Sequence, residues 1–439
     1  MMCAPAGRRT LISMPTYPLI ADHGLIGDLQ TAALVATNGC VDWFCAPRFD
    51  SPSIFGALLD AERGGHFRVR PTVDAFTSKQ LYLPDTAVLV TRFMTEAGVG
   101  EIVDFMPVTE GRVATTSHRL VRMVRCVRGE MTFALDIAPR FDYGREPFET
   151  HLTDDGVVFE GAHTAITLCL IREPDDERLA RTRVDEHGDV HAEVTLTAGQ
   201  MRGLVLQTGA AGPLRQVRVA EAWGLLNETV DFWERWLGQA TYAGRWRETL
   251  NRSAITLKLM TYAPTGALVA APTAGLPEQI GGERNWDYRY TWVRDASFSV
   301  YSLLGMGFTE EAAALGRWLR DRVAEQAEKD GGGPLKIMYR VDGSSDLTEE
   351  TLEHWEGYRG SAPVRIGNGA SGQLQLDIYG EALDSIYVAD RHGLTAGHEG
   401  WLRLCDLLRW VTENWDQPEE GIWETRGGRQ DFTYGRLMC

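Results

Sequence analysis

The sequence predicts a chain of two structural parts, an N-terminal β-sandwich followed by a helical domain. Its 439 residues exceed the usual size of one domain, so that two cores are expected. Apolar and polar residues alternate through the first half, as in strands, and the apolar spacing becomes helical near Val219. Twelve of the thirteen Trp lie at or after position 223, which assigns most aromatic surface to the helical half.

Strands are expected from about residue 17 to residue 212. Residues 190–197 alternate strictly between apolar and polar side chains, which is typical of a half-buried strand. Residues 133–137 and 166–170 repeat this pattern, and turn signals such as 154–156 separate the strands. Many short strands with polar outer faces favour a sandwich.

Helices are expected in the second half. Residues 223–237 and 246–257 each place their large apolar side chains on one helical face. Further helices are expected over 295–305, 309–328, 371–387 and 398–415, joined by the long connections 272–294, 330–368 and 417–432. Connections of this length favour a functional role. The expected division is a disordered leader (1–16), a β-sandwich domain (17–215), a helical linker (216–242) and a helical domain (243–439).

Composition narrows the function. A formal charge of −17 argues against nucleic acid or an anionic membrane as a partner. The seven Cys are scattered without a CxxC, which favours free buried thiols in a cytoplasmic protein. No apolar run is long enough to span a bilayer, and no metal or cofactor motif occurs, so none is expected. The sequence does not define an oligomeric state.

Asn285–Ser297 reads NWDYRYTWVRDAS, with two each of Trp, Tyr, Arg and Asp and almost no aliphatic residue. Burying unpaired charge is costly, so this composition is unlike that of a core segment. Aromatic rings stack on the apolar faces of sugars, while Arg and Asp hydrogen-bond the hydroxyls. The segment therefore favours a sugar-binding wall. The alternative is a helix entry in which Asp295, beside Arg294, caps the following helix.

The chain resembles glycoside hydrolase family 15, which holds glucoamylases, glucodextranases and bacterial trehalases. The resemblance is strongest to the trehalase-like bacterial and archaeal branch. Residues Gly24–Leu59 resemble the N-terminal signature of that branch. GGERNWDYRYTWVRDAS, EGYRGSAPVRIGNGASGQLQLDIYGEALD and EGIWETRGG follow in the family's order. The resemblance implies a β-supersandwich followed by an (α/α)6 barrel, and hydrolysis of α-glucosidic bonds with inversion by two carboxyl groups.

Glu424 matches the family's general acid, which follows a Trp in a Leu-Trp-Glu segment; here the residues are Ile422, Trp423 and Glu424. Apolar neighbours can raise the pKa of a carboxyl group and keep it protonated. The alternative is an exposed loop Glu beside Arg426. Glucoamylases carry a second acidic residue after the acid, whereas this chain has Thr425, which argues against starch as the substrate.

Further residues are assigned to the site by the same resemblance. Arg294 and Asp295 with Trp292 resemble the wall that grips the non-reducing glucose, and Gln375 and Asp377 resemble a pair that lines the pocket or begins a helix. Trp43 and Asp50 reach the pocket or, as we favour, secure the domain interface. The remaining candidates for substrate binding, which alternatively only pack the rim of the barrel, are Tyr290, Trp355, Tyr358, Arg359, Arg365, Asn368 and Trp423.

The general base is expected to be absent from these residues. The family's base comes from the second half of the barrel, whereas the sequence shows about five barrel helices and the start of another at FTYGRLMC. We therefore expect about the first half of the barrel, apolar patches on its helices, and little turnover by this chain alone, since each proton transfer contributes about 10²–10⁴-fold.

The expected partner is a small carbohydrate, an α-linked glucose disaccharide or oligosaccharide. Hydrolysis of α,α-trehalose to glucose is the leading prediction. A glucoamylase or glucodextranase acting on the non-reducing ends of α-glucans is the first alternative. A non-catalytic sugar-binding protein is the second.

Overall fold

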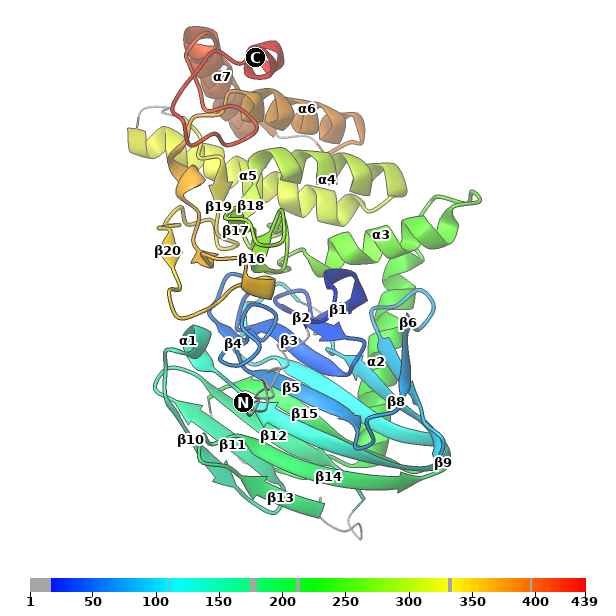
Figure 1. Cartoon of the computed structure of the whole chain (residues 1–439). Helices are drawn as coiled ribbons and strands as arrows, with labels where there is room; N and C mark the ends of the chain where they lie inside the picture. Colours follow the sequence, from blue (N-terminus) through cyan, green and yellow to red (C-terminus); the bar gives the residue numbers. More distant parts are fainter. Residues whose placement is uncertain (1–16, 110, 174–179, 211–213, 331–333, 395–396) are drawn as a thin grey trace, which may run out of the picture.

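The computed structural model describes residues 17–109, 111–173, 180–210, 214–330, 334–394 and 397–439. A large sheet-rich part lies below a stack of helices in Figure 1. The expected change from strand to helical spacing near Val219 is confirmed, because the first long helix begins at that residue. The leader expected over residues 1–16 lies outside the described residues.

Among the described residues, the sheet-rich part contains one continuous network of 15 hydrogen-bonded strands. The strands are β1 (His23–Gly27), β2 (Ala32–Ala36), β3 (Cys40–Cys45), β4 (Ser53–Phe55), β5 (His66–Pro71), β6 (Thr77–Tyr82), β7 (Leu89–Met94), β8 (Gly98–Phe105), β9 (Arg119–Ala138), β10 (Phe148–Leu152), β11 (Gly156–Gly161), β12 (Ala165–Ile171), β13 (Ala180–Val184), β14 (Val190–Thr197) and β15 (Met201–Gly209). A short 3-10 turn, η1 (Ile20–Asp22), precedes them, and α1 (Phe141–Gly144) follows β9.

The long strand β9 joins two layers of this sheet. Its first part pairs with β8 and β15, whereas its second part pairs with β5 and β14. The fully buried side chains of Phe67 in β5 and Phe93 in β7 belong to the core that the two layers enclose. The N-terminal part is therefore a β-sandwich, as the alternating pattern predicted.

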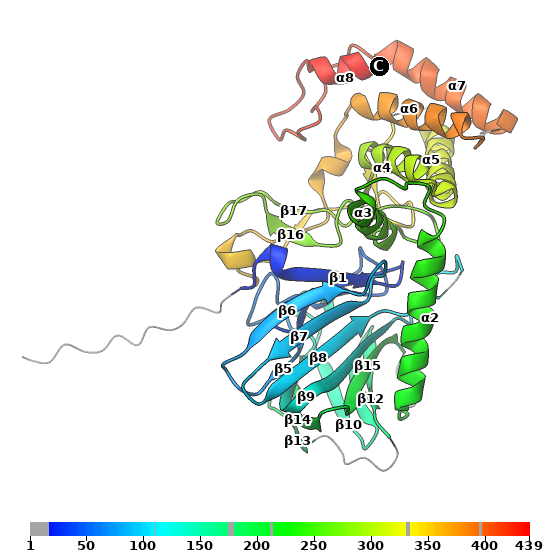
Figure 2. The ribbon, with the colours of Figure 1, turned by 90° about the vertical axis from the view of Figure 1, so that its right-hand side faces the viewer.

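Two predicted strands differ in their burial. β14 shows the expected alternation, with every second residue buried. β12 is buried along its whole length, because α2 (Val219–Leu237) covers its outer face, where Cys169 clusters with Ala222 and Leu226. Figure 2 shows α2 running along this side of the sheet. Both faces of β12 are therefore covered, one by the core between the layers and the other by α2.

The second part of the chain is a stack of helices. They are α3 (Arg247–Leu259), α4 (Val293–Met306), α5 (Thr309–Asp330), α6 (Asp377–Arg391), α7 (Gly397–Asn414) and α8 (Thr433–Met438). α4 packs against α5 and α6, while α7 lies against α5 and α8 against α6. The helices predicted over 295–305, 309–328 and 398–415 are confirmed to within two residues at each end.

The helix predicted over 371–387 begins later than expected. A short 3-10 turn, η3 (Gly369–Gly372), comes first, and α6 starts only at Asp377. The intervening backbone is held by another loop, since the N–H of Leu374 donates to Glu420 Oε2 at 2.8 Å and that of Leu376 donates to Glu419. Tertiary hydrogen bonds therefore replace a helical turn that local preference had favoured.

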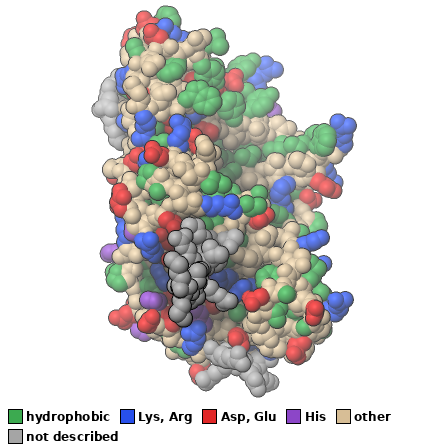
Figure 3. Space-filling view, viewed as in Figure 1, with side chains coloured by type: hydrophobic (Ala, Val, Ile, Leu, Met, Phe, Trp, Pro, Cys, Tyr) green, Lys and Arg blue, Asp and Glu red, His purple; other side chains and the backbone are tan. Residues whose placement is uncertain are grey.

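The helical part exposes large apolar side chains. Phe298 and Tyr301 on α4 are 57% and 63% exposed, and Trp401 on α7 is 57% exposed. Figure 3 shows hydrophobic side chains gathered on this part of the surface. These side chains agree with the apolar patches expected on the helices.

The six cysteines of the described residues are free thiols. Cys40, Cys45, Cys126 and Cys169 are buried as expected, whereas Cys439 is exposed. Within the described ranges, no helix is both long and apolar enough to cross a membrane.

Candidate active site

One pocket combines aromatic walls with carboxylates in the way that the sequence favours for sugar binding. Its volume is about 300 Å³, near the lower end of the range of small-molecule sites. It is lined by Ala270, Glu278, Arg284, Trp286, Tyr288, Trp292, Arg294, Asp295, Ile422, Trp423, Glu424 and Arg426. Its lining comes from two regions, the connection before α4 with the start of that helix and the loop before α8.

The wall of the pocket begins on a short hairpin made by β16 (Ala274–Pro277) and β17 (Asn285–Asp287). Side chains alternate along and beyond β17. Asn285, Asp287 and Arg289 are buried, while Trp286 and Tyr288 line the pocket. Trp292 continues the wall from β18 (Thr291–Trp292), which pairs with β19 (Met338–Tyr339). The Trp292 ring lies 5.6 Å from that of Tyr288.

Asp295 does not cap α4, so the helix-entry alternative is wrong in this respect. The helix begins at Val293, its N-cap position is Trp292, and no side chain caps it. Asp295 therefore lies inside the first turn, where a negative charge interacts favourably with the helix dipole. Its side chain is about half exposed (48%) and faces the pocket.

Arg294 lies among three carboxylates. Its Nη1 donates to Gln375 Oε1 at 3.0 Å and to Asp377 Oδ2 at 3.3 Å. Its Nη2 lies 3.8 Å from Glu424 Oε1 and 4.0 Å from Asp295 Oδ2. The guanidinium is thus anchored by Gln375 and Asp377 and presents positive charge to the two carboxylates of the pocket. Gln375 and Asp377 were expected to line the pocket or to begin a helix. Both are buried and contact Arg294 from outside the pocket lining.

Glu424 stands on a tightly held turn. Its φ is +52°, a left-handed conformation that is uncommon for residues other than glycine and that often marks functional sites. Its N–H donates to the carbonyl of Gly421 at 3.0 Å, and the Thr425 hydroxyl donates to the carbonyl of Glu420 at 2.9 Å. Gln373 reaches across to the carbonyl of Thr425 at 3.2 Å. Two hydrogen bonds within the turn and one from Gln373 outside it therefore hold Glu424 in this conformation.

The carboxyl group of Glu424 has one close hydrogen-bond donor, since Trp292 Nε1 donates to its Oε1 at 2.7 Å. Burial raises its pKa above the ordinary value for Glu. The hydrogen bond from Trp292 and the charge of Arg294 oppose this rise in pKa, whereas the negative charge of Asp295 adds to it. Burial also raises the pKa of Asp295, against the effect of Arg294. The pocket is therefore an environment in which a carboxyl group can hold a proton.

The structure brings together five of the residues proposed from the sequence. Trp292, Arg294, Asp295, Trp423 and Glu424 all line the pocket, although Trp423 is 76% exposed at its rim. Arg365 lies just behind the lining, with its guanidinium 4.6 Å from the ring centroid of Trp286.

Tyr290 and Asn368 lie outside the pocket lining in a buried cluster around Asp287. The Tyr290 hydroxyl donates to Asp287 Oδ2 at 3.0 Å, and Asn368 Nδ2 donates to the backbone carbonyl of Asp287 at 3.3 Å. Asn368 Oδ1 also accepts from the N–H of Ala370 at 3.0 Å at the start of η3 (Gly369–Gly372). Both side chains are committed to internal hydrogen bonds.

Trp355, Tyr358 and Arg359 contact the sandwich instead of the pocket. Their connection folds back, so that the Tyr358 hydroxyl donates to the carbonyl of Pro18 at 2.8 Å and Arg359 donates to that of Tyr17 at 3.1 Å. Trp355 packs edge-on against Tyr143, with ring centroids 5.8 Å apart. These three residues, which lie in or near η2 (Tyr358–Gly360), therefore have a packing role, which was the alternative to substrate binding.

Trp43 and Asp50 lie at the contact between the two parts of the molecule, as favoured. Trp43 Nε1 donates to the carbonyl of Pro272 at 2.7 Å, and the ring is fully buried. Asp50 accepts from Arg48 at 2.9 Å and from Arg340 of the helical part at 3.3 Å. These contacts secure the interface on which the hairpin rests.

Sequence reasoning did not single out several lining residues. Trp286 and Tyr288 belong to the segment identified as a sugar-binding wall, and the two-residue period of β17 would have placed them on one face. Glu278 and Arg284 pair with each other at 2.6 Å across the hairpin rim. Arg426, considered only as a neighbour of Glu424, also lines the pocket. No local pattern marks these last three residues.

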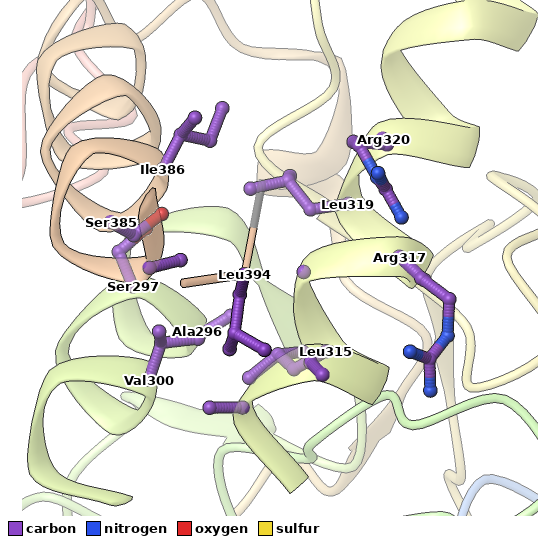
Figure 4. Close-up of a pocket in the computed structure, with 14 residues that line it drawn as sticks. Ala296, Ser297, Val300, Leu315, Arg317, Leu319, Arg320, Ser385, Ile386 and Leu394 are labelled. Carbon is purple, nitrogen blue, oxygen red and sulfur yellow. The ribbon is translucent and has the colours of Figure 1, made fainter. Parts of the chain in front are cut away.

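A second pocket, between α4, α5 and α6, has a different character. Its volume is about 140 Å³, and Leu315, Leu319 and Leu394, labelled in Figure 4, belong to its lining. Its lining includes Arg317 and Arg320 but no carboxyl group. In this respect the cleft differs from the pocket of Glu424, whose lining includes carboxyl groups. Among the described residues, no three His, Cys, Asp or Glu side chains gather as a metal site.

Both parts of the chain match models of known protein families. Residues 244–436 match the model for glycosyl hydrolases family 15, and residues 6–211 match that for the trehalase-like N-terminal region. A trehalase of Mycolicibacterium smegmatis is 36% identical over 444 residues, covering 96% of this chain and 65% of that protein. Trehalase 1 of Sulfolobus acidocaldarius is 34% identical over 424 residues, covering 94% of this chain and 68% of that protein.

A putative kojibiose phosphorylase from the human microbiome resembles the structure with a TM-score of 0.48 at 8% identity, over 88% of this chain and 56% of that chain. Its sequence identity to this chain is much lower than the 36% of the Mycolicibacterium trehalase. The chain belongs to glycosyl hydrolases family 15, which confirms the resemblance seen in its motifs. It spans 65% of the length of the Mycolicibacterium relative.

Proposed function

We propose that the pocket of Glu424 hydrolyses α,α-trehalose to two glucose molecules with inversion at the attacked carbon. The observation that carries the proposal is a partly buried carboxyl group of raised pKa that accepts a hydrogen bond from Trp292 in an aromatic-walled pocket. Relatives named trehalase that match over most of this chain support trehalose as the substrate.

Glu424 is proposed as the general acid that protonates the glycosidic oxygen. Its raised pKa keeps the carboxyl group protonated closer to neutral pH than an ordinary Glu. The indole of Trp292 can only donate a hydrogen bond, and it donates to Oε1. The proton to be transferred is therefore expected on Oε2, and the indole fixes the direction in which the acid points.

Asp295 is proposed to accept hydrogen bonds from hydroxyl groups of the glucose unit whose anomeric carbon is attacked. Its half-exposed side chain lines the pocket beside Arg294, whose position is set by Gln375 and Asp377. Trp286, Tyr288 and Trp292 offer ring surface to the apolar faces of the sugar. Trp423 and Arg365 are proposed as outer contacts, because they border the pocket rather than form its floor.

The general base is proposed to be a carboxylate other than Glu424 and Asp295. Inverting glycosidases hold their two carboxyl groups about 6.5–9.5 Å apart, with the attacking water between them and the sugar. Asp377 does not suit this role, since it is buried and accepts from Arg294. In keeping with the family, we further propose that the stacked helices belong to an (α/α)6 barrel.

The two alternatives have less support. The position after the acid is Thr425, whose hydroxyl donates within the turn, so the second acidic group of glucoamylases is lacking there. A non-catalytic sugar-binding protein has no need of a carboxyl group whose pKa is raised in the middle of its site.

The proposal is tested by offering trehalose and maltotriose to purified enzyme of the full length of its trehalase relatives, while NMR follows the anomers that first appear. Inversion at one carbon of α,α-trehalose releases one α-glucose and one β-glucose, whereas retention releases only α-glucose. We expect equal amounts of the two anomers from trehalose and slower release from maltotriose. Preference for maltotriose, or binding of trehalose without hydrolysis, would contradict the proposal.

A further inference from the structure

The ring of Trp286 is held from two different segments of the chain. The guanidinium of Arg426 lies 4.4 Å from its ring centroid, and that of Arg365 lies 4.6 Å from it. Arg426 belongs to the loop of Glu424, while Arg365 begins β21 (Arg365–Ile366). Flat guanidinium groups stack well on indole rings, so these two contacts define where this wall of the pocket stands.

A single carboxylate links both guanidinium groups. Arg426 Nη2 donates to Glu349 Oε2 at 2.8 Å, and Arg365 Nε lies 3.6 Å from Glu349 Oε1. The backbone N–H of Gly369 also donates to Glu349 Oε2, at 2.8 Å. Burial would raise the pKa of Glu349, but the hydrogen bonds from Arg426 and Gly369 hold it below the ordinary value for Glu. The group therefore carries its negative charge near neutral pH.

These contacts connect three loops around the pocket. Arg365 donates to the carbonyl of Glu283 at 2.7 Å, beside the hairpin that carries Trp286. Arg426 stands two residues after Glu424, and Gly369 leads into the segment that anchors Arg294. The Glu349 side chain is only 23% exposed and does not itself line the pocket. Any effect that it has on a sugar must pass through the groups that it holds.

We propose that Glu349 is a positioning residue for sugar binding, which acts through Arg426 and Arg365 to hold Trp286 against the bound glucose. This inference rests on the proposed function of the pocket. It gives Glu349 a role that a purely structural ion pair would lack, because loss of its charge weakens sugar binding while the fold persists.

The test compares Glu349→Gln with Glu350→Gln by calorimetric titration of trehalose. Glu350 is the neighbouring exposed residue, and it pairs with Arg145 on the sandwich at 2.6 Å, away from the pocket. We expect the Kd for trehalose to rise about five- to tenfold in Glu349→Gln, since stacking of cations on indole is worth this order of affinity. Glu350→Gln should keep the Kd of the unmodified protein, and both variants should melt within a few degrees of it.

The outcomes separate the inference from the function on which it rests. Failure of the unmodified protein to bind trehalose overturns both. Binding by the unmodified protein with an unchanged Kd in folded Glu349→Gln overturns the role of Glu349 alone. If Glu349→Gln does not fold, Arg426→Lys decides, because lysine keeps the charge but loses the flat stacking surface. A raised Kd in Arg426→Lys then supports the inference, and an unchanged Kd overturns it.

Discussion

Two arginines that are only five residues apart in the sequence, Arg289 and Arg294, pair with carboxylates in opposite ways. Arg289 and Asp287 are 1% and 0% exposed at their side chains and are joined at 2.7 and 2.9 Å. Arg289 also donates to the carbonyl of Ser51 at 2.7 Å and to the Tyr143 hydroxyl at 2.9 Å, both in the sandwich. This grouping is completely paired and joins the two parts of the molecule.

Arg294 and Glu424 form the contrasting grouping. They approach only to 3.8 Å, and Glu424 has a single close donor in Trp292. The Glu424 side chain is 22% exposed and lines the pocket. A fully paired charge stabilises a contact but is not free to exchange a proton. An incompletely paired, partly buried carboxyl group can exchange one. The comparison shows that neighbouring arginines of one segment meet carboxylates in very different surroundings, one fully paired and one open to the pocket.

The largest expected effect follows from removal of the acid. Glu424→Gln should lower kcat for trehalose about 10²–10⁴-fold, because the amide cannot donate the proton to the leaving oxygen. The Kd for trehalose should change little, since size and hydrogen bonding to Trp292 are retained. Glucose release and calorimetric binding measure the two quantities. Glu413→Gln, at an exposed position on α7, serves as the control, and equal turnover by both variants would refute the assignment of Glu424.

Removal of one partner from the paired grouping should affect stability. Arg289→Met leaves Asp287 as a buried, uncompensated charge, and we expect the free energy of unfolding to fall by about 3–5 kcal/mol. Urea unfolding measures it. Arg284→Met, which breaks the exposed pair with Glu278 on the same hairpin, should change stability little. If the two variants lose equal stability, the contrast between buried and exposed pairs does not hold here.

Loss of the ring that Arg365 and Arg426 contact should weaken sugar binding. Trp286→Ala is expected to raise the Kd for trehalose about tenfold, equivalent to about 1.4 kcal/mol. Trp423→Ala removes a ring that is 76% exposed at the rim, so its effect should be smaller. Calorimetric titration of both variants tests the order, and a larger effect at Trp423 would place the bound sugar near the rim instead of the wall.

The smallest expected effect concerns pH. Activity requires protonated Glu424 and is therefore lost as pH rises through its pKa, which burial raises above the ordinary value of about 4.3 for Glu. The charge of Asp295 contributes to this rise in pKa, so Asp295→Asn should move the alkaline limb of the kcat profile to lower pH. Rates of glucose release across the pH range show the shift. A limb that stays in place or moves upward would separate Asp295 from the titration of Glu424.

The interior of the fold follows closely from local patterns. Strand β14 covers the residues 190–197 whose alternation predicted it, and α2 begins where the apolar spacing changes. The segment Asn285–Ser297 was identified by its composition, and the structure places Trp292, Arg294 and Asp295 in one pocket with Glu424. Local side-chain periodicity and unusual composition are properties of the sequence itself, and for this reason they can be recognised before folding is known.

The same local patterns could not decide which loop residues face the pocket. Tyr290, Tyr358 and Arg359 are as aromatic or as charged as the residues that line it, yet they hydrogen-bond within a buried cluster or to the sandwich. Glu349 carried no distinguishing pattern, although it links both guanidinium groups on Trp286. Their placement depends on contacts between loops that are far apart in the chain.

The sequence by itself therefore determined the two-part architecture, the family and the segments from which the site is built. Only the tertiary structure decided that the indole of Trp292 meets Glu424, 132 residues away, that α6 starts late, and that Asp287 and Arg289 turn inward. Periodicity specifies which side of a helix or strand is apolar. The partners of polar groups in long loops are set by packing between distant segments, which bury those groups only where hydrogen bonds can be completed.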